Sequence, residues 1–262
     1  MANKLAVVTG ASTGIGFELA SIAAEGGYDL IVCADEALIE AAAADFRTHG
    51  TDVQSVEADL STIEGVDALL AATKGRDIDV LCANAGHGLG HAFLEQDVAD
   101  WRHVIDTNVT GTLYLLQHGL RQMVRRGEGK VLVTGSIAGY IPGAFNAVYN
   151  GSKAFVDSFT EALRNEIKEH ERITLTTLMP GATETEFFDR ADMLDTKVGT
   201  MKKDDANKVA QDGWDAMMAG KGHVVSGFKN KVQVALSGVV PPAMLAEQHR
   251  KQAEPGSADE QQ

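Results

Sequence analysis

Residues 5–16 read Leu5-Ala6-Val7-Val8-Thr9-Gly10-Ala11-Ser12-Thr13-Gly14-Ile15-Gly16, an apolar run that leads straight into a turn with three glycines. A helix is predicted next, because Phe17, Leu19, Ala20 and Ile22 carry its apolar positions. In such a unit the glycines let the backbone approach a pyrophosphate, and the positive end of the helix dipole faces it. The spacing G-x-x-x-G-x-G differs from the commoner G-x-G-x-x-G, and a glycine cluster can also be only a loop. We predict a nucleotide site, with candidate contacts at Gly10, Ser12, Thr13, Gly14, Ile15 and Gly16.

Six further apolar runs predict strands. They are residues 29–34, 53–58, 78–83, 130–135, 173–178 and 223–226. Predicted helices alternate with the strands, which are continuous apolar runs rather than half-polar alternations. Strands of this kind are buried on both faces, as in a parallel sheet between two layers of helices. We therefore expect an α/β fold, a Rossmann-like doubly wound sheet of seven parallel strands with helices on both faces.

A polar residue, a glycine or a proline follows each of the first six strands at the carboxyl end, where ligands bind in such sheets. They are Gly10, Asp35, Asp59, Asn84, Ser136 and Pro180. Asp35 is the candidate for the ribose hydroxyls of a dinucleotide, although it could instead cap the predicted helix 37–49. No arginine or lysine stands beside Asp35 and Glu36 or among the glycines. A 2′-phosphate would meet two carboxylates there, which favours NAD(H) over NADP(H).

The third and fourth strand ends carry candidate contacts for adenosine. Asp59, with Leu60 after it, could accept the adenine amino group, or it could begin the next helix with Ser61. The small residues of Asn84-Ala85-Gly86 would let the backbone lie against adenosine. Asn108 is a weak helix former inside a predicted helical segment, and its amide could bind backbone or a water at a bend.

Tyr149 and Lys153 share one face of the predicted helix 148–169, because side chains at i and i+4 stack. A tyrosine with a pKa of about 10 is too weak a base at neutral pH, and a neighbouring ammonium favours the phenolate. Ser136, at the end of strand 130–135, could hydrogen-bond the same substrate oxygen. This arrangement suits proton transfer to and from an alcohol or carbonyl, although an isolated Tyr-x-x-x-Lys is usually only a helix surface.

Composition limits the remaining possibilities. The chain has 262 residues, 44% of them hydrophobic, which suits one large domain or two small ones. With the alternating strands and helices, we expect a single domain over residues 1–252, followed by a disordered tail at 253–262. The net charge of −14 argues against nucleic-acid binding. No apolar run approaches the roughly 20 residues that span a bilayer, and no signal peptide is evident, so we expect a cytoplasmic protein without membrane contact.

Cysteines and histidines give no strong metal motif. Cys33 and Cys82 lie inside apolar runs and are expected to stay reduced. His87 and His91 have a ligand-like spacing but lie in a glycine-rich loop, so no metal site is expected.

The ordered set of motifs resembles the short-chain dehydrogenase/reductase family, in its single-domain type of about 250 residues. The resemblance covers roughly residues 4–228 and rests on Thr9-Gly10-x-x-x-Gly14-x-Gly16, Asp59, Asn84-Ala85-Gly86, Asn108, Ser136, Tyr149-x-x-x-Lys153 and Pro180-Gly181-x-x-x-Thr185. It implies an NAD(P)-dependent alcohol dehydrogenase or carbonyl reductase with Tyr149 as general acid/base, and Ser136 holding the substrate oxygen. Lys153 would lower the pKa of Tyr149 and bind the nicotinamide ribose, and Asn108 would hold a water in a proton relay. The segment from Pro180 to Thr185, with Gly181 and Thr183, would run alongside the nicotinamide ring, and Thr185 would contact the carboxamide of that ring.

The resemblance also bears on cofactor, substrate and assembly. The NAD-type aspartate of the family can sit one position before Asp35, so NAD(H) is favoured and NADP(H) stays an alternative. A mobile lid is expected at about 186–220. Its apolar residues, with Leu89, Phe93, Ile137, Tyr140 and Phe145, suggest an apolar or aromatic ketone, aldehyde or secondary alcohol, unless they only pack the lid onto the sheet. A homotetramer or homodimer would form through helices 107–126 and 148–169.

Two other functions fit the same fold. An epimerase or dehydratase with a tightly held nicotinamide usually has a longer substrate segment than the one between the sixth and seventh strands. A non-catalytic dinucleotide-binding regulator would be expected to lack Ser136, Tyr149 or Lys153, and all three are present.

Overall fold

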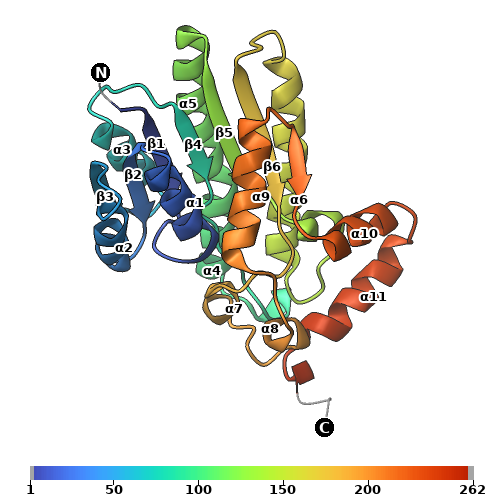
Figure 1. Ribbon diagram of the computed structural model, residues 1–262. Helices are drawn as coiled ribbons and strands as arrows, with labels where there is room; N and C mark the ends of the chain where they lie inside the picture. The colour runs from blue at the N-terminus through green and yellow to red at the C-terminus, as the bar shows by residue number, and fades with distance from the viewer. Residues whose placement is uncertain (1–2, 259–262) are drawn as a thin grey trace.

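Seven apolar segments form one sheet in the computed structural model, which describes residues 3–258 (Figure 1). The strands are β1 (Leu5–Thr9), β2 (Asp29–Ala34), β3 (Val53–Glu57), β4 (Val80–Ala83), β5 (Gly129–Thr134), β6 (Ile173–Met179) and β7 (His223–Val225). Their order is β3-β2-β1-β4-β5-β6-β7, and every neighbouring pair is parallel. The predicted doubly wound sheet is confirmed, and the step from β1 to β4 is the point at which the strand order reverses.

Helices cover both faces of the sheet. The first face carries α1 (Gly14–Glu25), α2 (Leu38–Arg47) and α9 (Ala206–Met218), and the second carries α3 (Ile63–Ala72), α5 (Thr112–Arg126) and α6 (Ala147–Glu166). Successive side chains of a strand point to opposite faces. In β1, Ala6 and Val8 therefore pack into the first core, whereas Leu5 and Val7 pack into the second. Both cores are apolar, which explains the unbroken apolar runs in the sequence.

The remaining helical segments gather at the carboxyl edge of the sheet. They are η1 (Phe93–Glu95), α4 (Val98–Ile105), η2 (Asp106–Gly111), η3 (Ile137–Tyr140), α7 (Phe187–Arg190), α8 (Lys197–Thr200), α10 (Phe228–Ser237) and α11 (Pro242–Ala253). Figure 1 shows α7, α8, α10 and α11 at the end toward which the strands point. Among the residues described, no helix combines the length and apolar composition needed to cross a bilayer.

Two segments differ from the sequence-based expectation. Part of the range 186–220 expected to form a lid is α9, whose Val209 and Trp214 are buried in the core, so a lid is left only around α7 and α8. Residues 253–258, expected to belong to a disordered tail, are packed: Ser257 Oγ accepts a hydrogen bond from Lys197 N at 3.1 Å. Ala258 N donates to Asp195 O at 3.0 Å. Composition does not reveal a partner about sixty positions away in the chain, and residues 259–262 lie outside the described part.

Candidate active site

The glycine turn between β1 and α1 requires glycine at each of its three positions. Gly10 and Gly14 have φ angles of +63° and +58°, which L side chains rarely adopt. A Cβ at Gly14 would lie 2.7 Å from Thr185 Cγ2, and one at Gly16 would collide with the carbonyl oxygen of Gly10. The turn therefore leaves bare backbone at the start of α1, as a pyrophosphate requires.

A cleft of about 310 Å³ opens beside this turn, along the carboxyl ends of the strands. Most of the predicted site residues line it: Gly10, Ser12, Thr13, Gly14, Ile15, Asp35, Asp59, Leu60, Asn84, Ala85, Gly86, Ser136, Tyr149, Lys153, Pro180, Gly181, Thr183 and Thr185. Gly16 and Asn108 are not among its lining residues. The residues predicted from the strand ends therefore lie along one continuous cleft.

The end of β2 carries a cation that local sequence did not reveal. Arg190 of α7 lies 2.7 Å from Glu36 Oε1 and 2.7 Å from Glu186 Oε2. Ser12 Oγ also donates to Glu36 Oε1, at 2.5 Å. Burial opposes ionisation of Glu36, but the hydrogen bonds from Ser12 and Arg190 lower its pKa. Arg190 is 154 residues from Glu36 in the chain, so no motif at the strand end could have shown it.

Asp59 and Asn84 both make contacts within the protein. Asp59 Oδ1 accepts from Ser61 N at 2.8 Å, so its carboxylate orders the start of the turn before α3. The amide of Asn84 donates to Thr9 O at 3.1 Å and accepts from Thr134 Oγ1 at 2.9 Å. Asn84 therefore connects the ends of β1, β4 and β5. Asp59 uses one carboxylate oxygen at the start of the turn before α3, and it would also contact adenine only if its second oxygen bound the ligand.

Tyr149 and Lys153 lie on one face of α6 and point into the base of the cleft with Ser136. Lys153 Nζ lies 5.8 Å from the centre of the Tyr149 ring and donates to Thr134 O at 2.7 Å. The expected lowering of the pKa of Tyr149 is not found: burial raises this pKa to about 12, although a hydrogen bond with Ser136 opposes the rise. A phenolate is poorly solvated in this position, so Tyr149 holds its proton at neutral pH.

A buried carboxylate, Asp157, lies one helical turn beyond Lys153. Burial raises the pKa of Asp157 to about 7 and lowers that of Lys153 to about 8, while the two groups partly stabilise each other's charge. Gly135 and Gly139 make room for Asp157, because a Cβ at either position would press on its carboxylate. Lys153, which lines the cleft, and Asp157 behind it therefore both have pKa values near neutral pH.

Asn108 lies in η2, a single π-helical stretch between α4 and α5. Its Oδ1 accepts from His87 N at 2.8 Å, and its Nδ2 donates to His87 O and to Ser152 Oγ, both at 2.9 Å. π-helical turns in α-helices are often found at functional sites. Of the two partners considered for the amide of Asn108, backbone or a water, the structure shows backbone, at this π-helical turn.

The loop after β6 lines the cleft from Pro180 to Thr185. Pro180 O accepts from Ile137 N at 3.0 Å, and Thr183 Oγ1 donates to Gly181 O at 3.0 Å. Thr185 Oγ1 accepts from Phe187 N at 3.2 Å, which places Thr185 at the start of α7.

The substrate end of the cleft has the expected apolar residues of the lid, among them Phe188, Met193 and Met201, together with more polar side chains than expected. Five apolar residues outside the lid were expected in the substrate pocket, and of these only Ile137 lines the cleft. Phe93 is 52% exposed instead. The lid contributes Phe187, whose ring centre lies 4.9 Å from that of Tyr149. Polar side chains supply much of the remaining lining: Asn146, Asn150, Asn230, Gln233, His249 and Gln252. Asn230 and Gln233 come from α10, and His249 and Gln252 come from α11. No function is predicted from the sequence for these two C-terminal helices.

His87 follows Asn84-Ala85-Gly86, and its spacing from His91 is the only feature by which the sequence suggests a metal ligand there. The structure separates the two: His91 Nε2 lies 2.8 Å from Asp192 Oδ2, whereas His87 Nε2 lies 3.1 Å from Asp35 Oδ2. The hydrogen bond from His87 is the main cause of a lowered pKa at Asp35. Asp35 does not cap α2, because that helix begins at Leu38 with Ala37 as its N-cap residue, and Asp35 lines the cleft.

Comparison with known proteins adds to this geometry. The profile of the short chain dehydrogenase family matches residues 4–196. The chain belongs to this family. It is therefore an oxidoreductase with a Rossmann-like sheet.

Relatives and solved structures agree with the family. An uncharacterized oxidoreductase of Staphylococcus saprophyticus is 33% identical over 80% of this chain and 88% of its own length. A serine 3-dehydrogenase of Rhizobium radiobacter is 34% identical over 69% of this chain and 72% of its own. A short-chain dehydrogenase/reductase of Burkholderia phymatum, solved with NAD, has a TM-score of 0.82 at 25% identity, covering 90% of this chain and 92% of its own. One from Sphingobium yanoikuyae, solved with NADPH, shares the fold with a TM-score of 0.80 at 24% identity over 91% and 96%.

Proposed function

We propose that this short-chain dehydrogenase transfers a hydride between a nicotinamide dinucleotide and the carbon of an alcohol or carbonyl group. The observation that carries the proposal is the convergence of Ser136, Tyr149 and Lys153 at the base of a cleft that begins at the glycine turn. The bare backbone at Gly10 and Gly14 fits a pyrophosphate, since a side chain at either position would be strained.

The residues divide the chemistry as follows. The bound nicotinamide would supply or accept the hydride at C4, and the protein would supply orientation and proton transfer. In reduction, Tyr149 would donate its proton to the substrate oxygen while Ser136 donates a hydrogen bond to the same oxygen. A pKa of about 12 keeps Tyr149 protonated and ready for this step at neutral pH. Lys153, with a pKa of about 8, would return a proton to Tyr149, and Asn108 would hold a water that connects Lys153 to solvent.

NAD(H) is the favoured cofactor, because Asp35 lies at the end of β2 with its carboxylate toward the cleft. The relative solved with NAD supports a nicotinamide dinucleotide without deciding between the two forms. NADP(H) stays an alternative, since Arg190 could leave Glu36 for a 2′-phosphate. Isothermal titration with NADH and NADPH at matched ionic strength distinguishes them.

The substrate is proposed to be a ketone, aldehyde or secondary alcohol with an apolar part against Phe187 and Ile137. It would also carry a hydrogen-bond donor, because Asn146 Oδ1 and Asn150 Oδ1 are buried without a partner among the described residues. Assembly as a dimer or tetramer through α5 and α6 is likewise a proposal, supported by the exposed Phe155 that stacks on Phe159 of α6.

Tyr149→Phe tests the mechanism directly. The variant keeps the ring beside Phe187 but has no proton to donate, so we expect turnover to fall by about 10²–10⁴-fold or more. NADH affinity should stay close to that of the wild type in the same titration. Retained turnover would overturn the role of Tyr149, whereas a wild type that binds NADH but reduces no carbonyl would favour a regulator.

A further inference from the structure

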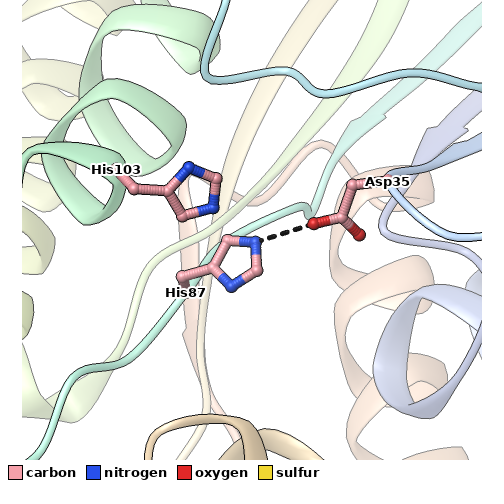
Figure 2. Close-up of side chains that lie close together, drawn as sticks. All are labelled: Asp35, His87 and His103. Atoms are coloured by element: carbon pink, nitrogen blue, oxygen red, sulfur yellow. Dashed lines mark hydrogen bonds and ion pairs between the residues drawn. The ribbon is translucent and has the colours of Figure 1, made fainter. Parts of the chain in front are cut away.

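Three potential metal ligands from three separate elements meet at the cofactor end of the cleft. Asp35 comes from the end of β2, His87 from the loop after β4, and His103 from α4 (Figure 2). One ligand atom from each lies within 4.8 Å of the other two. The ring centres of His87 and His103 are 4.6 Å apart, and the rings are inclined at 56°. Figure 2 shows the imidazole of His87 turned toward the Asp35 carboxylate, with the imidazole of His103 beside it.

One of the three distances between ligand atoms is close to that of a tetrahedral zinc site, and all three are within 4.8 Å. Zinc binds histidine nitrogen and carboxylate oxygen at about 2.0–2.2 Å, so two such ligands are about 3.3–3.5 Å apart at tetrahedral angles. The distance from His87 Nε2 to Asp35 Oδ2 is 3.1 Å, slightly shorter than this value, so these two groups need to separate by only a few tenths of an ångström to hold a metal. His103 is half-buried on a helix, and its ligand nitrogen lies within 4.8 Å of the ligand atoms of Asp35 and His87, so the third contact needs the His103 side chain to move closer.

The chemistry of the set selects the class of metal. Two imidazoles and one carboxylate suit zinc and its neighbours in the transition series, whereas magnesium and calcium prefer oxygen ligands alone. Arg190, whose charge acts on Asp35, forms its ion pairs with Glu36 and Glu186. Three protein ligands leave a fourth position for water, as in open zinc sites.

The position of His87 is determined by the protein before any metal binds. Asn108 accepts from its backbone N–H and donates to its carbonyl, at 2.8 and 2.9 Å. Groups held in this way lose little freedom on coordination. His91 is in a different situation, because it pairs with Asp192 on the lid and has no second histidine in its group.

We propose that Asp35, His87 and His103 form a binding site for a divalent transition metal such as Zn²⁺, and that bound metal excludes the dinucleotide from Asp35. The first half needs only the three side chains. The second half rests on the proposed function, in which Asp35 holds the adenosine ribose. One carboxylate cannot serve both ligands in full, so metal and dinucleotide would weaken each other's binding by the same factor.

Titration of the chelator-treated protein with ZnCl₂ tests the site. The wild type is expected to bind one zinc per chain, with no matching signal from MgCl₂. His103→Gln keeps a helix-forming residue and should weaken zinc by more than about tenfold, since even loss of a group behind a ligand costs about 10- to 100-fold. His91→Asn is the matched control, because it removes a histidine that also faces a carboxylate, and asparagine tolerates the φ of +70° at this position. It should bind zinc as the wild type does.

Substitution of Co²⁺ for Zn²⁺ gives a second readout, a visible spectrum of tetrahedral type that should vanish in His103→Gln. Thermal unfolding of both variants confirms that they are folded. Absence of one-to-one zinc binding by the wild type would overturn the site. So would a folded His103→Gln protein that binds zinc as tightly as the wild type, since His87 and Asp35 would then be only a hydrogen-bonded pair.

A titration with NADH, with and without saturating zinc, tests the exclusion. Zinc should raise the apparent Kd for NADH in the wild type and in His91→Asn, and it should have little effect in His103→Gln. Unchanged NADH affinity in zinc-loaded wild type would overturn the exclusion. Failure of the zinc-free wild type to bind NADH would instead count against the proposed function, and the zinc titration would still decide the metal site.

Discussion

Lys153→Met is expected to make the protein more stable at pH 6 and less stable above pH 10. Lys153 is 5% exposed, and burial lowers its pKa from 10.5 to about 8. At about 1.36 kcal/mol per pKa unit, the charged form costs the folded state about 3 kcal/mol. Methionine has a similar length and no charge to bury. It leaves Thr134 O without the 2.7 Å hydrogen bond, a loss of about 1–2 kcal/mol. The net gain at pH 6 is therefore about 1–2 kcal/mol.

The dependence on pH follows from the direction of the pKa change. The folded-state pKa lies below the unfolded one, so the folded protein binds fewer protons than the unfolded chain between about pH 8 and pH 10.5. The penalty is complete below pH 8 and disappears as the pH rises through this window, so the wild type overtakes the variant. Asp157, whose pKa is raised to about 7, is mostly neutral at pH 6 and does not obscure the comparison there.

Urea unfolding of both proteins at pH 6, 8 and 10.5 measures the difference, with turnover recorded at pH 7. The variant should lose activity while it gains stability, as expected where a functional group is buried at a cost. A Lys153→Met protein that is less stable than the wild type at pH 6 would refute the reasoning. A difference that stays constant from pH 6 to pH 10.5 would refute it as well, because the charge of Lys153 would then carry no penalty.

Two further outcomes can be checked with little additional work. Arg190→Gln removes the cation at the end of β2 and should weaken NADPH more than NADH in parallel titrations, because only NADPH has a 2′-phosphate that Arg190 could bind. Equal losses would assign Arg190 to holding the lid against Glu36. Cys33 and Cys82 have pKa values raised to about 12 by burial, so a thiol-directed reagent should label neither at pH 8 until denaturant is added; rapid labelling of the native protein would contradict their burial.

Strand ends were the most informative feature of the sequence. Continuous apolar runs predict a sheet that is covered on both faces, and parallel strands bring their carboxyl ends to one edge. Asp35, Asn84, Ser136 and Pro180 therefore had to lie near one another, and all four line the cleft. The same reasoning predicts nothing about groups that approach from another layer. His103 comes from α4 and Arg190 from α7, and no spacing in the sequence relates either residue to Asp35 or Glu36.

The pKa of Tyr149 could not be predicted from the sequence either. The spacing of Tyr149 and Lys153 predicts that they share a face, and from that the ammonium was expected to lower the pKa of the tyrosine. Burial is the larger effect at Tyr149, and it depends on how α6, β5 and the loop after β6 close around the ring. The negative charge of Asp157 acts in the same direction, although Asp157 carries no motif of its own.

Asn108 connects the catalytic end of the cleft with the proposed metal site. Its amide holds both backbone polar groups of His87, and its Oδ1 would lie 3.0 Å from a Cβ at Gly86. The same hypothetical Cβ would lie 3.4 Å from Lys153 Nζ, so Gly86 brings the loop close to both groups. The π-helical turn thus fixes one short loop whose start faces Lys153 and whose end presents His87 to Asp35. A change at Asn108 should therefore disturb proton transfer and zinc affinity together, whereas His103→Gln should disturb zinc affinity alone.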